Sequence, residues 1–212
     1  MDSYPLAAWC GADRRVPRAL RDLPVLDAVD DVVTCRRVVV VGTYADLGSV
    51  LRQLLRADRL DVEVAHVRHW WQARRARSAP AVRTPLIRDE TAAVLTREAY
   101  WLPPEGQDTI VGEAIVDDHR LFDGECAALR VEPTPTLPGL RATVWRGRWR
   151  PKRWVAGRAA QLGTTGALVV RDGQPATRPV RRSTFYRHTQ GWLRVPTSRS
   201  WSSGVRSSGS GT

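Results

Sequence analysis

Acidic residues almost vanish from the second part of this 212-residue chain. After Glu132 the sequence holds one acid, Asp172, against 15 basic residues, so residues 133–212 carry a net charge of +14. Residues 1–132 hold the other 21 acids and 18 basic residues, a net charge of −3. So large a local excess of positive charge is expected to attract an anionic ligand: a nucleotide, an anionic lipid or a nucleic acid.

Lysine, cysteine and long apolar runs are also scarce. Lys152 stands alone beside 32 arginines, a usage typical of a high-GC bacterial genome. Three widely spaced cysteines form no CxxC pair, which excludes a disulfide framework and a thiolate zinc site. No apolar run approaches the ~18 residues of a transmembrane helix, and the first residues lack the order of a signal peptide. These absences predict a soluble, cytoplasmic protein with no transmembrane segment and no metal site.

The clearest structural pattern lies between residues 36 and 67. Val38–Val41 followed by Gly42 is typical of a buried strand. Apolar residues at helical spacing follow, beginning at Leu47, and Asp46 is a candidate cap for that helix. Residues 60–67 form a second candidate strand. Strand, helix and strand joined by short links predict a βαβ unit with a parallel sheet.

From residue 86 onward short strand-like segments alternate with turns, which indicates a sandwich or barrel-like lobe. The expected turns include Asp123-Gly124, Gly163–Gly166 and Asp172-Gly173. The fold class expected is therefore α/β, with an N-terminal βαβ-containing lobe followed by a β-rich, sandwich-like lobe. The expected organisation is a lead-in segment (1–35, with a short helix over Ala19–Val33), an α/β lobe (36–88), a basic β-rich lobe (89–197) and a Ser/Gly-rich flexible tail (198–212). Within the α/β lobe, residues 68–85 are expected to be a mobile loop or a short exposed helix.

A strand that ends in glycine before a helix is a place where phosphate can bind, because the first amides of a helix are free to donate. Gly42, Thr43 and Asp46 are therefore the candidate cofactor-binding residues. The alternative is a plain strand-to-helix turn, because neither GxGxxG nor GxxxxGK[ST] is present and the carboxylate of Asp46 would repel phosphate.

Two carboxylates are candidates for acid–base chemistry. Asp123 and Glu125 flank a glycine and are suited to hold a cation or to move a proton. Solvated turn residues are the alternative. His66 and His69 are three residues apart, but no cysteine or carboxylate completes a ligand set around them.

The strongest candidate binding surface combines tryptophan with arginine between residues 145 and 154. Indole rings with cations suit a lipid headgroup region, or single-stranded nucleic acid whose bases stack on the rings. A hairpin with inward-packed tryptophans is the alternative. Arg181 and Arg182 add to the same positive field. The candidate anion-binding residues are Trp145, Arg146, Arg148, Trp149, Arg150, Lys152, Arg153, Trp154, Arg181 and Arg182.

The valine strand, its glycine and the following helix resemble the nucleotide turn of the diacylglycerol/sphingosine-type lipid kinases, whose superfamily includes the NAD kinases. The family turn reads Gly-Gly-Asp-Gly-Thr, then Leu-Asn-Glu-Val, and Gly42, Leu47 and Val50 match it. Tyr44 and Ala45 replace the family's acid and later glycine. The resemblance extends to two Asp-Gly turns, at Asp123 and Asp172. The family's Gly-Thr-Gly-Asn-Asp segment is not found.

The resemblance implies a nucleotide lobe followed by a β-sandwich lobe, with ATP and Mg²⁺ as cofactors and lipid at a membrane surface as substrate. The changes in the turn imply a lipid-kinase-like protein with weak or no activity that binds nucleotide or anionic lipid at the membrane periphery. Two alternatives stay open. One is a nucleic-acid-binding module that uses the Arg/Trp-rich surface, and the other is a structural or regulatory domain.

Overall fold

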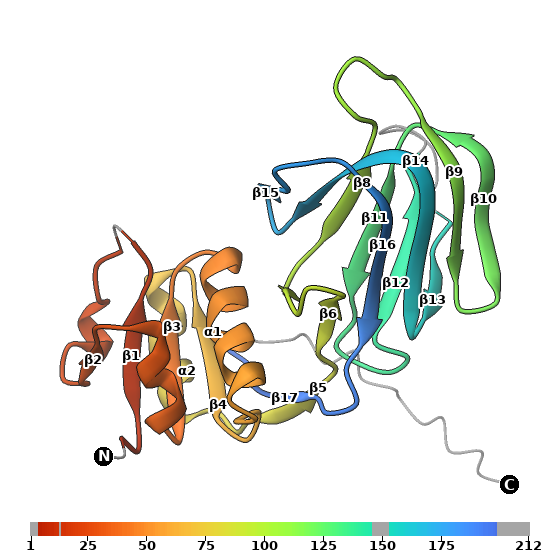
Figure 1. Cartoon of the computed structure of the whole chain (residues 1–212). Coiled ribbons are helices and arrows are strands. Elements are labelled where there is room, and N and C mark those ends of the chain that lie inside the picture. Colours follow the sequence, from red (N-terminus) through yellow and green to blue (C-terminus); the bar gives the residue numbers. More distant parts are fainter. Residues whose placement is uncertain (1–3, 13, 146–152, 199–212) are drawn as a thin grey trace, which may run out of the picture.

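The computed structural model describes residues 4–12, 14–145 and 153–198, and they form two lobes (Figure 1). The first lobe contains a six-stranded sheet in the order β2-β1-β3-β4-β17-β5. β1, β3, β4 and β17 run parallel, and β5 is antiparallel to β17. The strands of this sheet are β1 (Ala7–Cys10), β2 (Val25–Leu26), β3 (Arg37–Val41), β4 (Glu63–Val67), β5 (Val82–Thr84) and β17 (Trp192–Val195).

Both faces of this sheet are covered, which explains the run of valines. Val38 and Val40 point into a core shared with helix α1 (Tyr44–Arg56), while Val39 and Val41 point into a second core with α2 (Ala73–Ser78). Successive side chains of a strand alternate between faces, so a strand buried on both sides must be apolar throughout. The predicted strand, helix and parallel strand are confirmed. Short 3₁₀ segments complete the two layers: η1 (Arg18–Leu20), η2 (Val29–Thr34) and η3 (Trp70–Gln72).

Two segments lie elsewhere than the sequence suggested. The expected lead-in supplies β1 and β2 to the first sheet, and in place of a helix over Ala19–Val33 it forms η1, β2 and η2. β17, expected in the basic lobe, returns to pair with β4 of the first lobe. These pairings join residues 17 to 130 positions apart along the chain, so no local pattern could reveal them.

The second lobe is a β-sandwich around a core that includes Trp101 and Phe185. Its long strand β14 pairs with β9 and β16 in one layer and with β8 in the other, so one strand joins both layers. The predicted sandwich-like lobe is confirmed. Its strands are β6 (Ile87–Asp89), β7 (Val94–Leu95), β8 (Ala99–Leu102), β9 (Ile110–Val116), β10 (His119–Cys126), β11 (Leu129–Pro133), β12 (Leu140–Val144), β13 (Val155–Gly157), β14 (Ala159–Arg171), β15 (Gln174–Pro175) and β16 (Val180–Arg187).

Two expected turns are strand residues instead. Asp123-Gly124 lies inside β10, opposite Glu113 and Gly112 of β9, and the hairpin turns at Asp117, whose φ is +48°. Gly163–Gly166 lies inside β14 at a shift of register, where the strand passes between layers. The third expected turn, Asp172-Gly173, does connect β14 with β15.

Candidate ligand-binding cavity between the lobes

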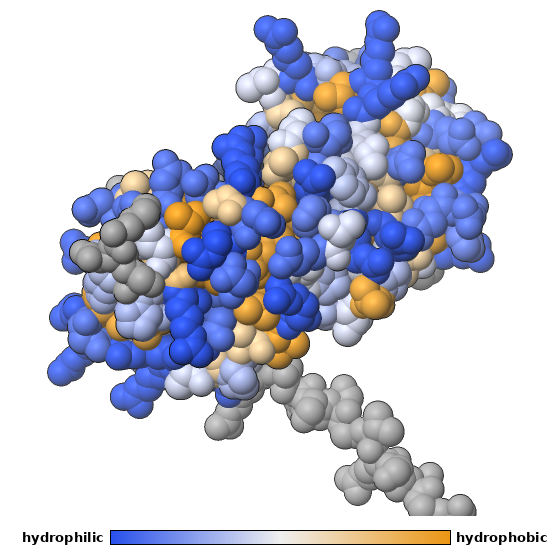
Figure 2. Space-filling model, turned by 60° about the horizontal axis from the view of Figure 1, so that its bottom comes forward, coloured by the Kyte–Doolittle hydropathy of each residue, from blue (hydrophilic) through white to orange (hydrophobic). Residues whose placement is uncertain are grey.

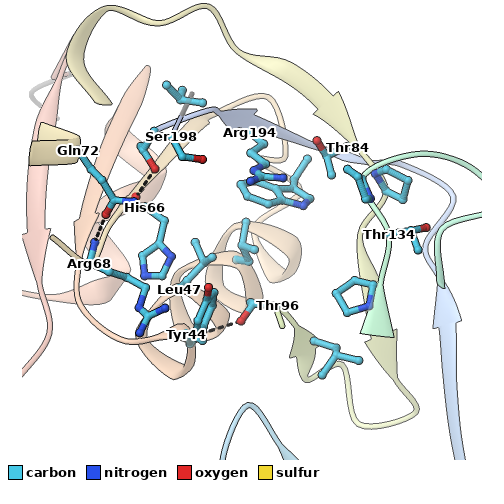
Figure 3. A pocket seen from close by; sticks show the side chains of 18 of the residues that line it. Tyr44, Leu47, His66, Arg68, Gln72, Thr84, Thr96, Thr134, Arg194 and Ser198 are labelled. Atoms are coloured by element: carbon cyan, nitrogen blue, oxygen red, sulfur yellow. Dashed lines mark hydrogen bonds between the residues drawn. The ribbon is translucent and has the colours of Figure 1, made fainter. Parts of the chain in front are cut away.

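A cavity of about 360 Å³ lies between the two lobes. The first lobe contributes residues from α1, from the segment after β4 and from β17, and the second contributes Leu95, Thr96 and residues 133–135. Figure 3 shows Tyr44, His66 and Arg68 on one side of the cavity and Thr84 and Thr134 on the other. Hydrophobic surface is visible where the lobes meet (Figure 2), in keeping with the leucine and valine side chains of the lining.

The parallel strands of the first sheet determine where this cavity forms. Arg68 and His69 directly follow β4, and Thr197 and Ser198 follow β17. The carboxyl ends of parallel strands lie at one edge of a sheet, which is where ligands bind in open α/β sheets. Thr197 Oγ1 donates a hydrogen bond to the His66 carbonyl at 2.8 Å, which holds the two strand ends together.

The polar lining of the cavity is mostly cationic or hydrogen-bond donating. Arg68 and Arg194 both line it, together with His66 and His69. The guanidinium of Arg68 lies 4.6 Å from the centre of the Tyr44 ring, in cation–π contact. Guanidinium groups favour anionic oxygens and bind phosphate in a bidentate manner. The chemistry of the lining therefore suits an anionic ligand.

His66 is the most buried titratable group of the cavity. Its Nε2 lies 3.1 Å from the carbonyl oxygen of Gly42, and because a carbonyl can only accept, the ring proton is on Nε2. Its ring packs edge-on against Tyr44 at 5.2 Å. Burial lowers the pKa of His66, and hydrogen bonds with the Gly42 and Thr43 backbone oppose that shift. The neutral imidazole is therefore the favoured form at neutral pH.

The three candidate cofactor residues meet in the turn between β3 and α1, but their donors are already occupied. Thr43 is the helix cap, and its hydroxyl accepts from the Asp46 amide at 3.2 Å. Asp46, expected as the cap, is instead the third helical residue and the partner of Thr43 in a capping box. Its carboxylate accepts from the Thr43 amide at 2.7 Å and from the Thr43 hydroxyl at 2.8 Å. No side chain would fit at Gly42 without displacing Asp46, because Asp46 Oδ2 lies 2.4 Å from where a Cβ would stand.

The two candidate catalytic carboxylates lie away from the cavity. Asp123 and Glu125 are exposed residues of β10, and neither is among the residues that line the cavity. Arg120 donates to Asp123 at 3.1 Å, and Thr109 donates to Glu125 at 3.2 Å. The structure thus places these residues on a strand that pairs only with β9.

The predicted basic and aromatic surface is only partly described. Arg146, Arg148, Trp149, Arg150 and Lys152 lie outside the described residues.

Of the described part of that surface, Trp145 stands edge-on to Tyr100 at 6.5 Å, and Arg153 lines a separate cavity of about 350 Å³. Arg141 stacks over the half-buried Trp154 ring at 4.3 Å. Arg181 and Arg182 are exposed on β16, which is not a neighbour of β13 in the sheet.

Sequence reasoning missed Arg68, Arg194 and Thr96 as cavity residues. One signal was available for Arg68, because it directly follows a predicted strand of a parallel sheet. Arg194 reaches the cavity through the long-range pairing of β17 with β4, for which the sequence offers no local signal. Within the described ranges, no group of three or more His, Cys, Asp or Glu side chains is placed to hold a metal ion.

The two-lobed fold of this chain is shared with solved structures. The chain matches the crystal structure of an NAD kinase from Archaeoglobus fulgidus in complex with ATP, with a TM-score of 0.62 and 15% identity over 91% of this chain and 94% of that one. No family model matches the chain, and no curated protein matches it in sequence.

Two diacylglycerol kinase structures from Bacillus anthracis, one of them described as putative, are equally similar. Each has a TM-score of 0.62 and covers 92% of this chain, at 10% and 9% identity, over 97% and 98% of the other chain. Identity this low shows the fold alone, and the resemblance to the NAD kinase and diacylglycerol kinase fold is confirmed. No helix in the described part of the chain is long and apolar enough to cross a membrane.

Proposed function

We propose that this chain is a lipid-kinase-like protein that binds a phosphate-bearing ligand, a nucleotide or an anionic lipid, in the cavity between its lobes, with weak or no phosphoryl transfer. The observation that carries the proposal is the cationic lining of that cavity by Arg68 and Arg194, near the carboxyl ends of β4 and β17. The fold it shares with an ATP-bound NAD kinase supports a nucleotide as the first ligand to test.

Weak or absent transfer is supported by the composition of the β3–α1 turn. Tyr44 stands where the resembling family has an acid, and it brings an aromatic ring to the cavity instead of a carboxylate. Phosphoryl transfer needs metal-bridged phosphates and a positioned base. The Asp46 carboxylate already accepts from the Thr43 amide and hydroxyl, so it competes with phosphate for those donors. We therefore assign phosphate recognition to Arg68 and Arg194.

The apolar part of the lining supports a ligand that also has a hydrophobic or aromatic portion. Leu47, Leu51 and Leu95 line the cavity beside the half-buried indole of Trp192. A purine ring or the first carbons of an acyl chain would gain from contact with these groups, while the phosphate faces the arginines. We place such a protein in the cytoplasm, where both ligand classes are present.

A thermal-shift titration of the whole chain with ATP in the presence and absence of Mg²⁺, with NAD, and with anionic lipid micelles tests this proposal. A saturable rise in melting temperature with one of these ligands is expected. Arg68→Gln and Arg194→Gln are each expected to weaken that binding about tenfold or more, because each removes a charge-assisted hydrogen bond.

Arg181→Gln is the matched control, because Arg181 is exposed on β16 and does not line the cavity. Asp123→Ala and Glu125→Ala are also expected to leave ligand binding unchanged. If ATP turnover is detected and either variant abolishes it, β10 takes part in catalysis. If no ligand shifts the melting temperature, or if Arg181→Gln weakens binding as much as Arg194→Gln, the proposed cavity function is wrong.

A further inference from the structure

Two adjacent tryptophans stand exposed on the surface of the first lobe. Trp70 and Trp71 form most of η3, directly after the turn that leaves β4, and their exposed fractions are 75% and 60%. Indole is the largest side chain and is usually well buried. Two adjacent indoles exposed to solvent therefore indicate a surface that contacts a membrane or another molecule.

The local structure holds these indoles outward in a fixed arrangement. The side-chain oxygen of Gln72 accepts from the backbone amides of Arg68 and His69, at 2.8 and 2.9 Å, which closes the turn. His69 stacks parallel on Trp71 at 4.4 Å, and Trp70 meets Trp71 edge-on at 5.9 Å. The next helix, α2, is anchored to the sheet by the buried Ala73 and Ala76. The pair is therefore preformed and needs little ordering on contact.

Cationic groups surround the pair. A wide groove of about 1140 Å³ runs between η1 and α2, and its lining includes Trp70, Trp71, Arg18 and Arg74. Arg18, Arg74 and Arg75 are exposed, and none of them has an acidic partner among the described residues. Asp22, which pairs with Arg77 of the groove lining at 2.6 Å, is already neutralised by that arginine. The groove thus carries an excess of positive charge.

We propose that Trp70, Trp71, Arg18, Arg74 and Arg75 form a docking surface for an anionic lipid bilayer. Indoles reside at headgroup depth in membranes, and arginines beside them meet lipid phosphate. Single-stranded nucleic acid is a poorer fit, because successive bases need open ring faces on which to stack. Here His69 covers one face of Trp71, and the Trp70 ring stands nearly perpendicular to its neighbour.

The docking surface and the cavity share one turn. Arg68, His69 and Gln72 line the cavity, while Trp70 and Trp71 between them face the groove. A bilayer held by the two indoles would therefore lie beside the cavity rim. The docking itself needs no ligand in the cavity, so it stands independently of the proposed function.

Flotation of the whole chain with phosphatidylcholine vesicles, prepared with and without phosphatidylglycerol, tests the docking surface. Binding only to the anionic vesicles is expected, and Trp70→Ala/Trp71→Ala is expected to abolish it. Arg74→Gln/Arg75→Gln is expected to lower partitioning about 30-fold, because each cation near an anionic surface contributes about fivefold. Thermal unfolding of each variant checks that the fold is kept.

Two controls make the result specific. Arg181→Gln/Arg182→Gln removes the same charge from exposed positions of the second lobe, and Leu137→Ala removes an exposed apolar side chain outside the docking surface. Both are expected to keep full vesicle binding. The proposal is wrong if the wild-type chain does not float, or if the arginine control weakens binding as much as Arg74→Gln/Arg75→Gln. It is also wrong if a single-stranded oligonucleotide displaces the chain from vesicles and binds through Trp70 and Trp71.

Discussion

At the residue scale, the burial of His66 predicts how stability depends on pH. Burial lowers the pKa of His66, and the same cause lowers the pKa of His188. In the unfolded chain these histidines take up a proton near pH 6.5, whereas in the folded chain they stay neutral until the pH is lower. The free energy of unfolding is expected to be at its full value above pH 6.5 and to fall as the pH drops below it.

Urea unfolding of the wild-type chain and of His66→Gln, measured between about pH 7.5 and about pH 5, isolates the contribution of one histidine. Glutamine can still donate to the Gly42 carbonyl but does not titrate, so the stability of this variant should depend less steeply on pH. His188→Gln provides the matched comparison at the other histidine with a lowered pKa. Equal slopes for His66→Gln and the wild-type chain would show that His66 titrates normally in the folded state.

Single residues also show where sequence reasoning reached its limit. The sequence offers Gly42 as a candidate phosphate contact or as part of a plain strand-to-helix turn, and the structure shows Asp46 against it, with Oδ2 2.4 Å from where a Cβ would stand. The identity of the glycine was informative, because it does mark a close approach, but the partner is a side chain of the same turn. Arg194 was not predicted at all, because its place in the cavity depends on a strand pairing that spans most of the chain.

At the scale of elements, the turn between β3 and α1 contains a coupling that can be measured. A Cβ at Gly11, which follows β1, would stand 2.4 Å from Asp46 Oδ2, and all three of its nearest atoms belong to the Asp46 carboxylate. Gly11→Ala is therefore expected to destabilise the chain by about 1–3 kcal/mol, since the carboxylate must leave the capping box. In an Asp46→Ala background the same change should cost less than about 0.5 kcal/mol.

A double-mutant cycle by urea unfolding checks this coupling. Asp46→Ala alone is expected to cost about 1 kcal/mol through the loss of its hydrogen bonds with Thr43. Additive costs for Gly11→Ala and Asp46→Ala would mean that the glycine serves another purpose. Ser49→Ala, on the exposed side of α1, is a control that should show no coupling with Gly11→Ala.

Elements with a strong local pattern were predictable, and elements defined by distant partners were not. The valine strand and the helix after it follow from their apolar spacing, because both faces of the strand and one stripe of the helix are buried. β1 and β17 carry no such pattern. Asp123-Gly124 has the composition of a turn, yet both residues pair with β9 inside the hairpin. The turn of this hairpin is at Asp117, which has the left-handed backbone conformation.

At the scale of the whole molecule, the two lobes are tied together in three ways. The chain crosses between lobes after β5 and again before β17, so the first lobe is formed by two separate segments and the second lobe by the segment between them. The third tie is the segment that leads from β7 into β8, where Thr96 contacts Tyr44 of α1 and Asp172, in the turn between β14 and β15, holds the backbone amides. The cavity lies between these ties, so its shape depends on how firmly the lobes are held.

The Asp172 tie is the part of this arrangement that can be removed by one substitution. Its carboxylate accepts from the amides of Thr96, Arg97 and Glu98 at 2.8 to 3.0 Å and lies 2.8 Å from the Thr96 hydroxyl. That hydroxyl also lies 3.0 Å from the Tyr44 carbonyl at the start of α1, and its one hydrogen can be donated to either acceptor, so Asp172 acts on the first lobe by positioning Thr96.

Asp172→Ala is expected to destabilise the chain by about 2–4 kcal/mol, because three amides and a hydroxyl lose their acceptor. Asp172→Asn keeps one carbonyl acceptor and tolerates the φ of +48°, so it should cost about half as much. Hydrogen exchange distinguishes a tie between lobes from a purely local turn. If the tie holds the lobes together, Asp172→Ala will lower amide protection in α1 as well as around residues 96–98. Loss confined to β14 and β15 would mean that Asp172 stabilises its own hairpin and does not hold the lobes together.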